Sequence, residues 1–219
     1  MDFIREDYDN KTEEKNKYLN NLHQIIVKSG IPLEGNCFYR HNTLELFSQL
    51  YTKQLNLFWC GKQAKTTICE IGFNAGHSTM LMLLGRDKSP LTYTIFDIGM
   101  HSYTRPCLEY MKSEFPNIMF EYVEGDSTVT MPQWINSRPH LEGTYDIVHV
   151  DGGHYEHCIK NDMINADRLV KIGGLIIVDD TNDSIINSYV DKYIQTGKYR
   201  NMYLLETFEY PHRVIKRIQ

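Results

Sequence analysis

A glycine-rich turn in the first half of the chain constrains the fold more than any other feature. Residues 66–71 are β-branched or apolar apart from Glu70, which is typical of a buried strand. Gly72 and Gly76 then permit a tight turn and let a ligand approach the backbone. The apolar run 79–84 predicts a helix, and the free amides at a helix start favour an anionic group. The stretch therefore predicts a strand, turn and helix of an α/β protein, with or without a nucleotide-type ligand.

Strands and helices alternate along the rest of the chain. We expect strands at 66–71, 92–97, 118–123, 145–150 and 174–179, and helices near 78–86, 104–114, 156–171 and 184–195. Two closing strands, 202–208 and 213–218, are joined by a loop short enough only for an antiparallel hairpin. The predicted fold class is α/β. It is a Rossmann-like, doubly wound, mostly parallel seven-stranded sheet with a C-terminal antiparallel hairpin and helices on both faces.

The N-terminal part of the chain is more polar than the rest. Residues 1–20 predict a mobile start, followed by a short helix at 19–28 and by a helix at 43–56 with one apolar face. We therefore expect an N-terminal polar and helical extension over residues 1–40 and one domain over residues 41–219.

The composition excludes several classes of protein. The formal charge of −5 and the scattered basic residues argue against nucleic acid as a partner. No apolar run is long enough to span a bilayer, and the first residues do not form an apolar leader, so we expect a cytoplasmic protein without membrane contact. Five cysteines, an odd number without close pairs, fit a reducing compartment.

Acidic residues follow all five of the expected parallel strands. Ligands of open parallel sheets bind at the carboxyl ends of the strands. One acid there means little, because strands end in polar loops. Several acids on one rim would repel one another unless a cation or a hydroxyl-rich ligand lies among them. The acids are Glu70, Asp97, Glu124 with Asp126, Asp151, and Asp179 with Asp180.

The glycine turn distinguishes two classes of cofactor. The dinucleotide fingerprint Gly-x-Gly-x-x-Gly requires glycine where this chain has Asn74, which argues against a nicotinamide-dependent dehydrogenase. The segment Glu70-Ile71-Gly72-Phe73-Asn74-Ala75-Gly76-His77-Ser78, followed by Asp97 and by Gly125-Asp126-Ser127, resembles the class I S-adenosylmethionine-dependent methyltransferases.

That resemblance implies S-adenosylmethionine as cofactor and a role for each matching position. Gly72, Asn74 and Ser78 would hold its methionyl end, Asp97 its ribose, and the Asp126 segment its adenine. Glu70 would orient the turn. The full set of implied cofactor residues is Glu70, Gly72, Phe73, Asn74, Gly76, Ser78, Asp97, Asp126, Ser127 and Asp151.

A second polar group indicates the type of reaction. Asp151 and His154 lie three residues apart around two glycines, and Asp179-Asp180 ends the next strand. Three hard oxygen ligands on one rim suit Mg²⁺ or another hard divalent cation. The alternatives are that Asp179 or Asp180 caps the following helix and that His154 is a hydrogen-bonded loop residue.

A metal and a base would solve the chemical problem of methylating an alcohol. A divalent cation lowers the pKa of bound water from 15.7 to about 7 at best, and a coordinated substrate hydroxyl should respond in the same direction. A histidine can then accept the proton near neutral pH. We therefore predict His154 and Asp151 as catalytic residues and Asp151, Asp179 and Asp180 as metal ligands.

The pattern is similar to that of the metal-dependent O-methyltransferases. Asp151 and Asp179 match the metal aspartates of the catechol O-methyltransferases, whereas Asp180 stands in place of Asn and His154 in place of Lys. Both departures resemble the metal-dependent sugar O-methyltransferases. The resemblance implies an enzyme that methylates a hydroxyl of a small molecule, with a sugar or other vicinal diol as acceptor. A catechol or phenol acceptor, a non-catalytic binding module and a homo-oligomeric state remain open.

Overall fold

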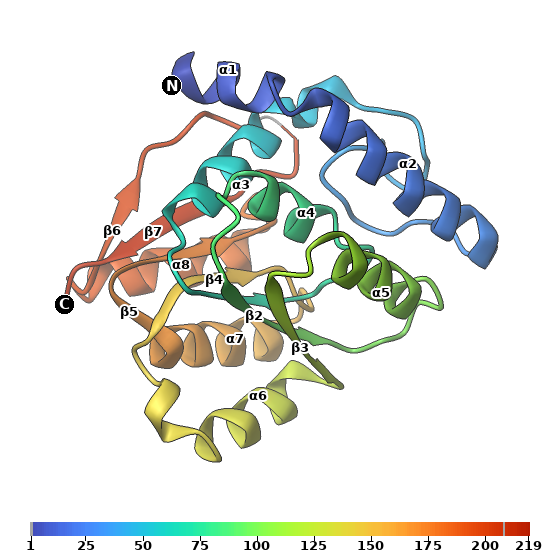
Figure 1. The fold of residues 1–219 in the computed structure, drawn as a ribbon. Helices are drawn as coiled ribbons and strands as arrows, with labels where there is room; N and C mark the ends of the chain where they lie inside the picture. The colour runs from blue at the N-terminus through green and yellow to red at the C-terminus, as the bar shows by residue number, and fades with distance from the viewer. Residues whose placement is uncertain (1, 208) are drawn as a thin grey trace.

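A computed structural model describes residues 2–207 and 209–219 of the chain (Figure 1). Seven strands form one sheet in the order β3-β2-β1-β4-β5-β7-β6. The first five of these are parallel neighbours, and β7 runs antiparallel to both β5 and β6. The strands are β1 (Thr67–Ile71), β2 (Leu91–Asp97), β3 (Ile118–Glu124), β4 (Tyr145–Val150), β5 (Val170–Val178), β6 (Tyr199–Met202) and β7 (Arg213–Arg217). The predicted fold class is confirmed.

In the described part of the chain, eight α-helices cover the two faces of this sheet (Figure 1). One apolar core packs α2 to α5 against the sheet, and a second packs α6 to α8 against the opposite face. The helices are α1 (Asp2–Asp9), α2 (Thr12–Ser29), α3 (Tyr51–Gln63), α4 (His77–Leu84), α5 (Thr104–Glu114), α6 (Ser127–Asn136), α7 (Glu156–Leu169) and α8 (Ser184–Gln195). Short 3₁₀ turns lie at Ser48–Leu50 and Pro139–Leu141.

The alternation of side chains along β4 and β5 determines where the polar strand ends point. Ile147 and Ile177 belong to the core on the α3 side of the sheet. Side chains two residues further along a strand lie on the same face, so His149 and Asp179 also point toward α3. Asp151 directly follows β4 and lies two residues after His149, so its side chain points to the same face. The strands thus gather these polar groups beneath α3.

The predicted mobile start is wrong for the residues that the structure describes. The segment forms α1 and the first part of α2, and Ile4 and Tyr8 are buried in the same core as α3. The Tyr8 hydroxyl donates to Gln54 Oε1 at 2.6 Å. The short helix predicted at 19–28 lies within α2, whereas Met1 of the predicted mobile segment lies outside the described residues.

Several elements differ from the prediction. The helix predicted at 43–56 begins only at Tyr51, because residues 39–47 form a turn closed by a bridge between Tyr39 and Leu46. The sequence analysis missed α6, whose interior Pro132 argues against a helix; the Asp126 side chain caps its start. The first closing strand lies at β6 rather than at 202–208, and Phe208 of that prediction lies outside the described residues.

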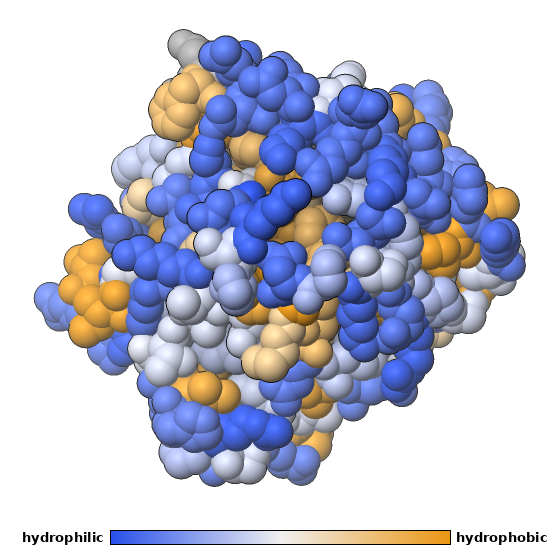
Figure 2. Space-filling model, in the orientation of Figure 1, coloured by the Kyte–Doolittle hydropathy of each residue, from blue (hydrophilic) through white to orange (hydrophobic). Residues whose placement is uncertain are grey.

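The surface is largely polar on the face shown in Figure 2, with apolar side chains in separate small groups. Among the described residues, no helix combines the length and the hydropathy needed to cross a membrane. The exposed apolar side chains come from several separate elements, for example Leu46, Met119 and Ile172.

Candidate active site

The glycine turn after β1 lies directly against the end of β4. Gly72 has φ +86°, and a Cβ atom there would stand 1.9 Å from the carbonyl oxygen of Asp151. Gly76 has φ +79° and packs on the Phe73 ring, which is buried. A side chain at Gly72 would displace the β4 end, so the contact requires glycine. The predicted cofactor turn and the predicted reaction site therefore share a backbone contact.

The Asp97 carboxylate at the end of β2 holds the glycine turn in place. Its Oδ2 atom accepts hydrogen bonds from the backbone amides of Phe73 and Asn74, at 2.8 and 2.9 Å. Its Oδ1 atom accepts one from Gly99 at 2.7 Å. The structure thus brings the predicted ribose-binding acid to the predicted cofactor turn, although its present partners are backbone groups.

The Asn74 side chain connects the turn to the N-terminal part of the chain. Its amide donates to the backbone carbonyls of Glu34 and Gly35, the latter at 3.0 Å. The amide of Glu34 also donates to the Tyr103 hydroxyl at 3.5 Å. The loop at residues 34–35 is therefore fastened over the predicted cofactor turn.

Glu70 lies in the interior and not on the open rim. It is fully buried and accepts hydrogen bonds from the hydroxyls of Ser78 (2.5 Å), Thr79 and Tyr93 (2.9 Å). Its Oε1 atom also lies 3.0 Å from Nδ1 of His149. The Ser78 hydroxyl, predicted to hold the methionyl end, therefore points inward in this structure. His77 is also buried, and burial lowers its pKa to about 3.

The predicted adenine residues lie at the start of α6. Asp126 is exposed and accepts from the Thr128 amide at 2.8 Å as the helix cap. The Ser127 hydroxyl donates to Asp162 Oδ1 at 2.7 Å. Asp162 is fully buried, its Oδ2 atom has no partner among the described residues, and burial raises its pKa to about 7. This carboxyl, which the sequence analysis missed, stands beside Gly152.

A compact acidic cluster forms where β4 and β5 end. One side-chain atom each of His149, Asp151 and Asp179 lies within 4.8 Å of the others. The Lys53 ammonium on α3 reaches the same place and lies 2.6 Å from Oδ2 of Asp179. Lys53 and Asp179 are both buried, so this is an interior ion pair.

The charges in the cluster shift one another's pKa. Burial and the neighbouring Asp179 raise the pKa of Asp151 well above its ordinary value. Burial alone would raise the pKa of Asp179, but Lys53, together with His212 and His149, outweighs this effect and lowers it. Burial alone would likewise lower the pKa of Lys53, and Asp179 raises it instead. Asp151 is therefore the acid whose charge this cluster compensates least.

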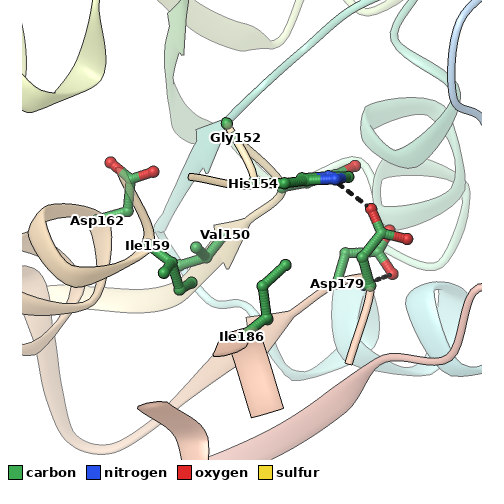
Figure 3. Close-up of a pocket in the computed structure, with 10 residues that line it drawn as sticks. Val150, Gly152, His154, Ile159, Asp162, Asp179 and Ile186 are labelled. Atoms are coloured by element: carbon green, nitrogen blue, oxygen red, sulfur yellow. Dashed lines mark hydrogen bonds and ion pairs between the residues drawn. The ribbon is translucent and has the colours of Figure 1, made fainter. Parts of the chain in front are cut away.

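Asp180 and His154 form a separate pair at the mouth of the cluster. His154 Nε2 lies 2.8 Å from Asp180 Oδ2, and Figure 3 shows the His154 ring directed at the acids that end β5. The hydrogen bond to Asp180 raises the pKa of His154. In the same view Asp162 lies apart, beyond Val150 and Ile159. The structure thus brings together Asp151 with Asp179 and His154 with Asp180, in two adjoining groups.

A groove of about 310 Å³ opens beside Thr181, two residues after Asp179. It is lined mainly by the loop between β6 and β7, together with Asn56 and Thr181. His212 is buried at its edge, and neither ring nitrogen has a partner among the described residues. Burial lowers the pKa of His212 to about 3, so the ring is neutral.

Sequence reasoning missed four residues of this region. Two had a usable signal. His149 precedes Asp151 by two positions in a strand, which places both on one face, and Asp162 is an acid on the apolar side of a helix. The other two, Lys53 and His212, had no such signal, because their positions depend on how α3 and the C-terminal hairpin pack.

The comparison with protein families shows to which family the chain belongs. A family model described as a methyltransferase domain matches residues 69–181, slightly more than half of the chain. The chain belongs to this methyltransferase family. The matched range of the methyltransferase runs from within β1 to just beyond Asp180 and so contains the turn and the acidic cluster. The predicted class of enzyme is confirmed. A search of curated proteins gives no match to the methyltransferase.

Solved structures share the fold of this methyltransferase at low sequence identity. The O-methyltransferase TomG from Streptomyces achromogenes, solved with SAM, has a TM-score of 0.65 and 14% identity over 92% of this chain and 90% of that chain. An O-methyltransferase from Bacillus cereus, solved with SAH, has a TM-score of 0.64 and 15% identity over 93% and 91%. A TDP-rhamnose 3'-O-methyltransferase of calicheamicin biosynthesis, in its apo form, has a TM-score of 0.59 and 15% identity over 93% and 94%.

Proposed function

We propose that the protein transfers the methyl group of S-adenosylmethionine to a hydroxyl of a small molecule, a sugar or another vicinal diol. The observation that carries the proposal is the contact between Gly72 and the Asp151 carbonyl. It sets a cofactor-type turn directly against an acidic cluster suited to binding hydroxyls. Solved structures with this fold include O-methyltransferases bound to SAM or SAH and one that methylates a sugar nucleotide.

The cofactor would lie along the strand ends from β4 to β3. Gly72 and Asn74 would present backbone groups to its methionyl part, and Asp97 would exchange part of its backbone contacts for the ribose hydroxyls. Ser127 would border the adenine from the start of α6, with Asp162 behind it. The N-terminal extension, residues 1–40, would cover the cofactor through its loop at residues 34–35.

The acidic cluster fits a divalent cation in charge and in donor chemistry. The raised pKa of Asp151 shows a carboxyl short of positive charge, and buried His149 Nε2 has no partner among the described residues. Asp151 and Asp179 would hold the ion, with Asp180 at the mouth of the cluster. When bound, the ion would lower the pKa of an acceptor hydroxyl.

The protein's own groups would carry the remaining steps. His154, oriented by Asp180 at 2.8 Å, would accept the proton of the acceptor hydroxyl. The acceptor would enter from the groove beside Thr181, whose edge holds the buried, neutral ring of His212. Methyl transfer to a positioned oxygen mainly requires alignment with the sulfonium carbon.

Two measurements on the purified protein test this function. Calorimetric titrations with S-adenosylmethionine and with NAD should show binding of the first only. Labelled S-adenosylmethionine should then methylate members of a panel of methyl glycosides and nucleotide sugars, with catechol and caffeate as comparison acceptors. Cofactor binding without transfer to any acceptor would favour a non-catalytic binding module, and transfer to catechols alone would favour the phenol alternative.

A further inference from the structure

The buried imidazole of His149 stands directly behind the acidic cluster. His149 is on β4, two residues before Asp151, and shares its face of the sheet with Asp179. Its side chain is 1% exposed. A ring nitrogen lies within 4.8 Å of a carboxylate oxygen of each acid. The fold thus places one nitrogen donor and two oxygen donors around a common point.

The hydrogen bonds of Glu70 decide which nitrogen of His149 is free. Glu70 accepts from three hydroxyls and therefore keeps a fixed position in the interior. Its Oε1 atom lies 3.0 Å from Nδ1 of His149, so Nδ1 carries the proton and donates it. The Nε2 atom has no partner among the described residues. In a neutral ring Nε2 then bears a lone pair. A buried acceptor atom without a bonding partner is unfavourable and calls for an explanation.

We propose that His149 is a protein ligand, with Asp151 and Asp179, of a transition-metal ion, and that Glu70 orients its ring. This proposal rests on the function proposed above. A metal-binding histidine commonly donates its other ring N–H to a carboxylate, which fixes the tautomer and the direction of the lone pair. The pair of His149 and Glu70 has this arrangement, buried beneath the cluster.

The assignment replaces Asp180 in the predicted set of ligands. Asp180 has φ +52°, and its carboxylate is paired with His154 at 2.8 Å. It is not a member of the group of atoms that converge within 4.8 Å. Asp180 therefore orients His154, the proposed proton acceptor, and the nitrogen of His149 is the third protein ligand of the metal ion.

The change of ligand also changes the expected ion. Carboxylates alone suit Mg²⁺, Ca²⁺ and Mn²⁺, whereas an added imidazole nitrogen favours first-row transition ions such as Fe²⁺, Ni²⁺ and Zn²⁺ over Mg²⁺ and Ca²⁺. Lys53 is the competing cation, because its ammonium already lies 2.6 Å from Asp179 Oδ2. An ion at this site must share Asp179 with Lys53 or displace it.

Manganese provides the probe. Pulsed electron paramagnetic resonance of the wild-type protein loaded with Mn²⁺ should show hyperfine coupling to a directly bound ¹⁴N nucleus. Calorimetry should show Mn²⁺ binding at least about tenfold tighter than Mg²⁺ binding. His149→Ala should weaken Mn²⁺ binding by about tenfold or more, and Asp180→Asn, the matched control, should change it by less than about threefold. Lys53→Met should strengthen it.

Three results would overturn the assignment. They are a wild-type Mn²⁺ spectrum without nitrogen coupling, a loss of Mn²⁺ affinity in Asp180→Asn as large as in His149→Ala, and no Mn²⁺ binding by either the wild type or Lys53→Met. The spectrum needs no variant, so it decides the matter even where His149→Ala fails to fold. Titration with S-adenosylmethionine alone and transfer to glycosides test the proposed function separately.

Discussion

At the scale of single residues, the site depends on one buried ion pair. Lys53 is 2% exposed, and its ammonium lies 2.6 Å from Asp179. Neither charge has access to bulk water, so each stabilises the other against the cost of its own desolvation. Asp179 remains ionised for this reason, whereas Asp151 beside it has a raised pKa. Asp151 therefore holds its proton more tightly than Asp179 does.

Replacing Lys53 by Met should destabilise the fold substantially. The change leaves Asp179 buried without its partner, which costs about 3–5 kcal/mol in comparable pairs. Urea denaturation followed by circular dichroism measures this free energy of unfolding. Lys62→Met is the matched control on the same helix. Its pair with Asp7 is partly exposed, so its loss should cost less than about 1 kcal/mol. Equal effects of the two substitutions would contradict the account of Lys53.

Asp162 should make stability depend on pH. Burial raises its pKa in the folded state to about 7, above its ordinary value of 3.8. The folded state therefore binds more protons between these values. The contribution of Asp162 is complete below about pH 4 and is lost as the pH rises through about 7. The loss amounts to at most about 4 kcal/mol.

The variant Asp162→Asn keeps an acceptor for Ser127 and removes the titration. Its free energy of unfolding should change less between pH 5 and pH 8 than that of the wild type, as measured by urea denaturation at each pH. Glu156→Gln, an exposed acid on the same helix, is the control and should keep the wild-type profile. If Asp162→Asn keeps the wild-type dependence of unfolding free energy on pH, Asp162 is not the source of that dependence.

At the scale of elements, an N-terminal loop is fastened to the predicted cofactor turn. Asn74 donates to the carbonyls of Glu34 and Gly35. These are side-chain bonds across 39 and 40 positions of sequence. The turn itself is fixed independently, because the backbone amides of Phe73 and Asn74 donate to the Asp97 carboxylate. The loop can therefore be released without disturbing the turn.

Asn74→Gly is expected to release this loop alone. Asn74 has φ +53°, and glycine adopts that backbone conformation without strain, so the substitution removes only the amide. Each bond is worth about 1 kcal/mol net. Hydrogen exchange at residues 33–36 should become roughly tenfold faster. Asn117→Ala removes a comparable amide bond to Lys88 elsewhere and should leave that exchange unchanged. Unaltered exchange in Asn74→Gly would show that other contacts hold the loop.

The sequence predicted the elements that depend on local patterns and missed those that depend on packing. The five parallel strands follow from apolar runs, and the acids at their ends, apart from the buried Glu70, share a rim because parallel strands end on one edge. Helix α6 was not predicted, and its interior Pro132 is unfavourable to a helix by propensity. Lys53 was missed because the rotation of α3 about its axis is fixed by its contacts with α1, α4 and the sheet.

At the scale of the whole molecule, the two parts of the site lie on opposite sides of the boundary between the neighbouring strands β1 and β4. The Asp97 side of the sheet holds the turn, and the β4–β5 side holds the acidic cluster. The helices α1 and α2 cross over the α3 side of the sheet in Figure 1 and pack into the same core as α3 and α4. The N-terminal extension therefore contributes to the stability of the face on which the acidic cluster lies.

Two asparagines hold outer segments of the chain near the site, one from each end of the sequence. Asn74 fastens residues 34–35, and Asn56 exchanges two hydrogen bonds with the backbone of Leu205, at 2.8 and 3.1 Å. Neither attachment belongs to the sheet. Both segments can open while the sheet stays intact, on the microsecond to millisecond scale typical of such loops. On the proposed function, departure of the spent cofactor would then require the attachment at Asn74 to open.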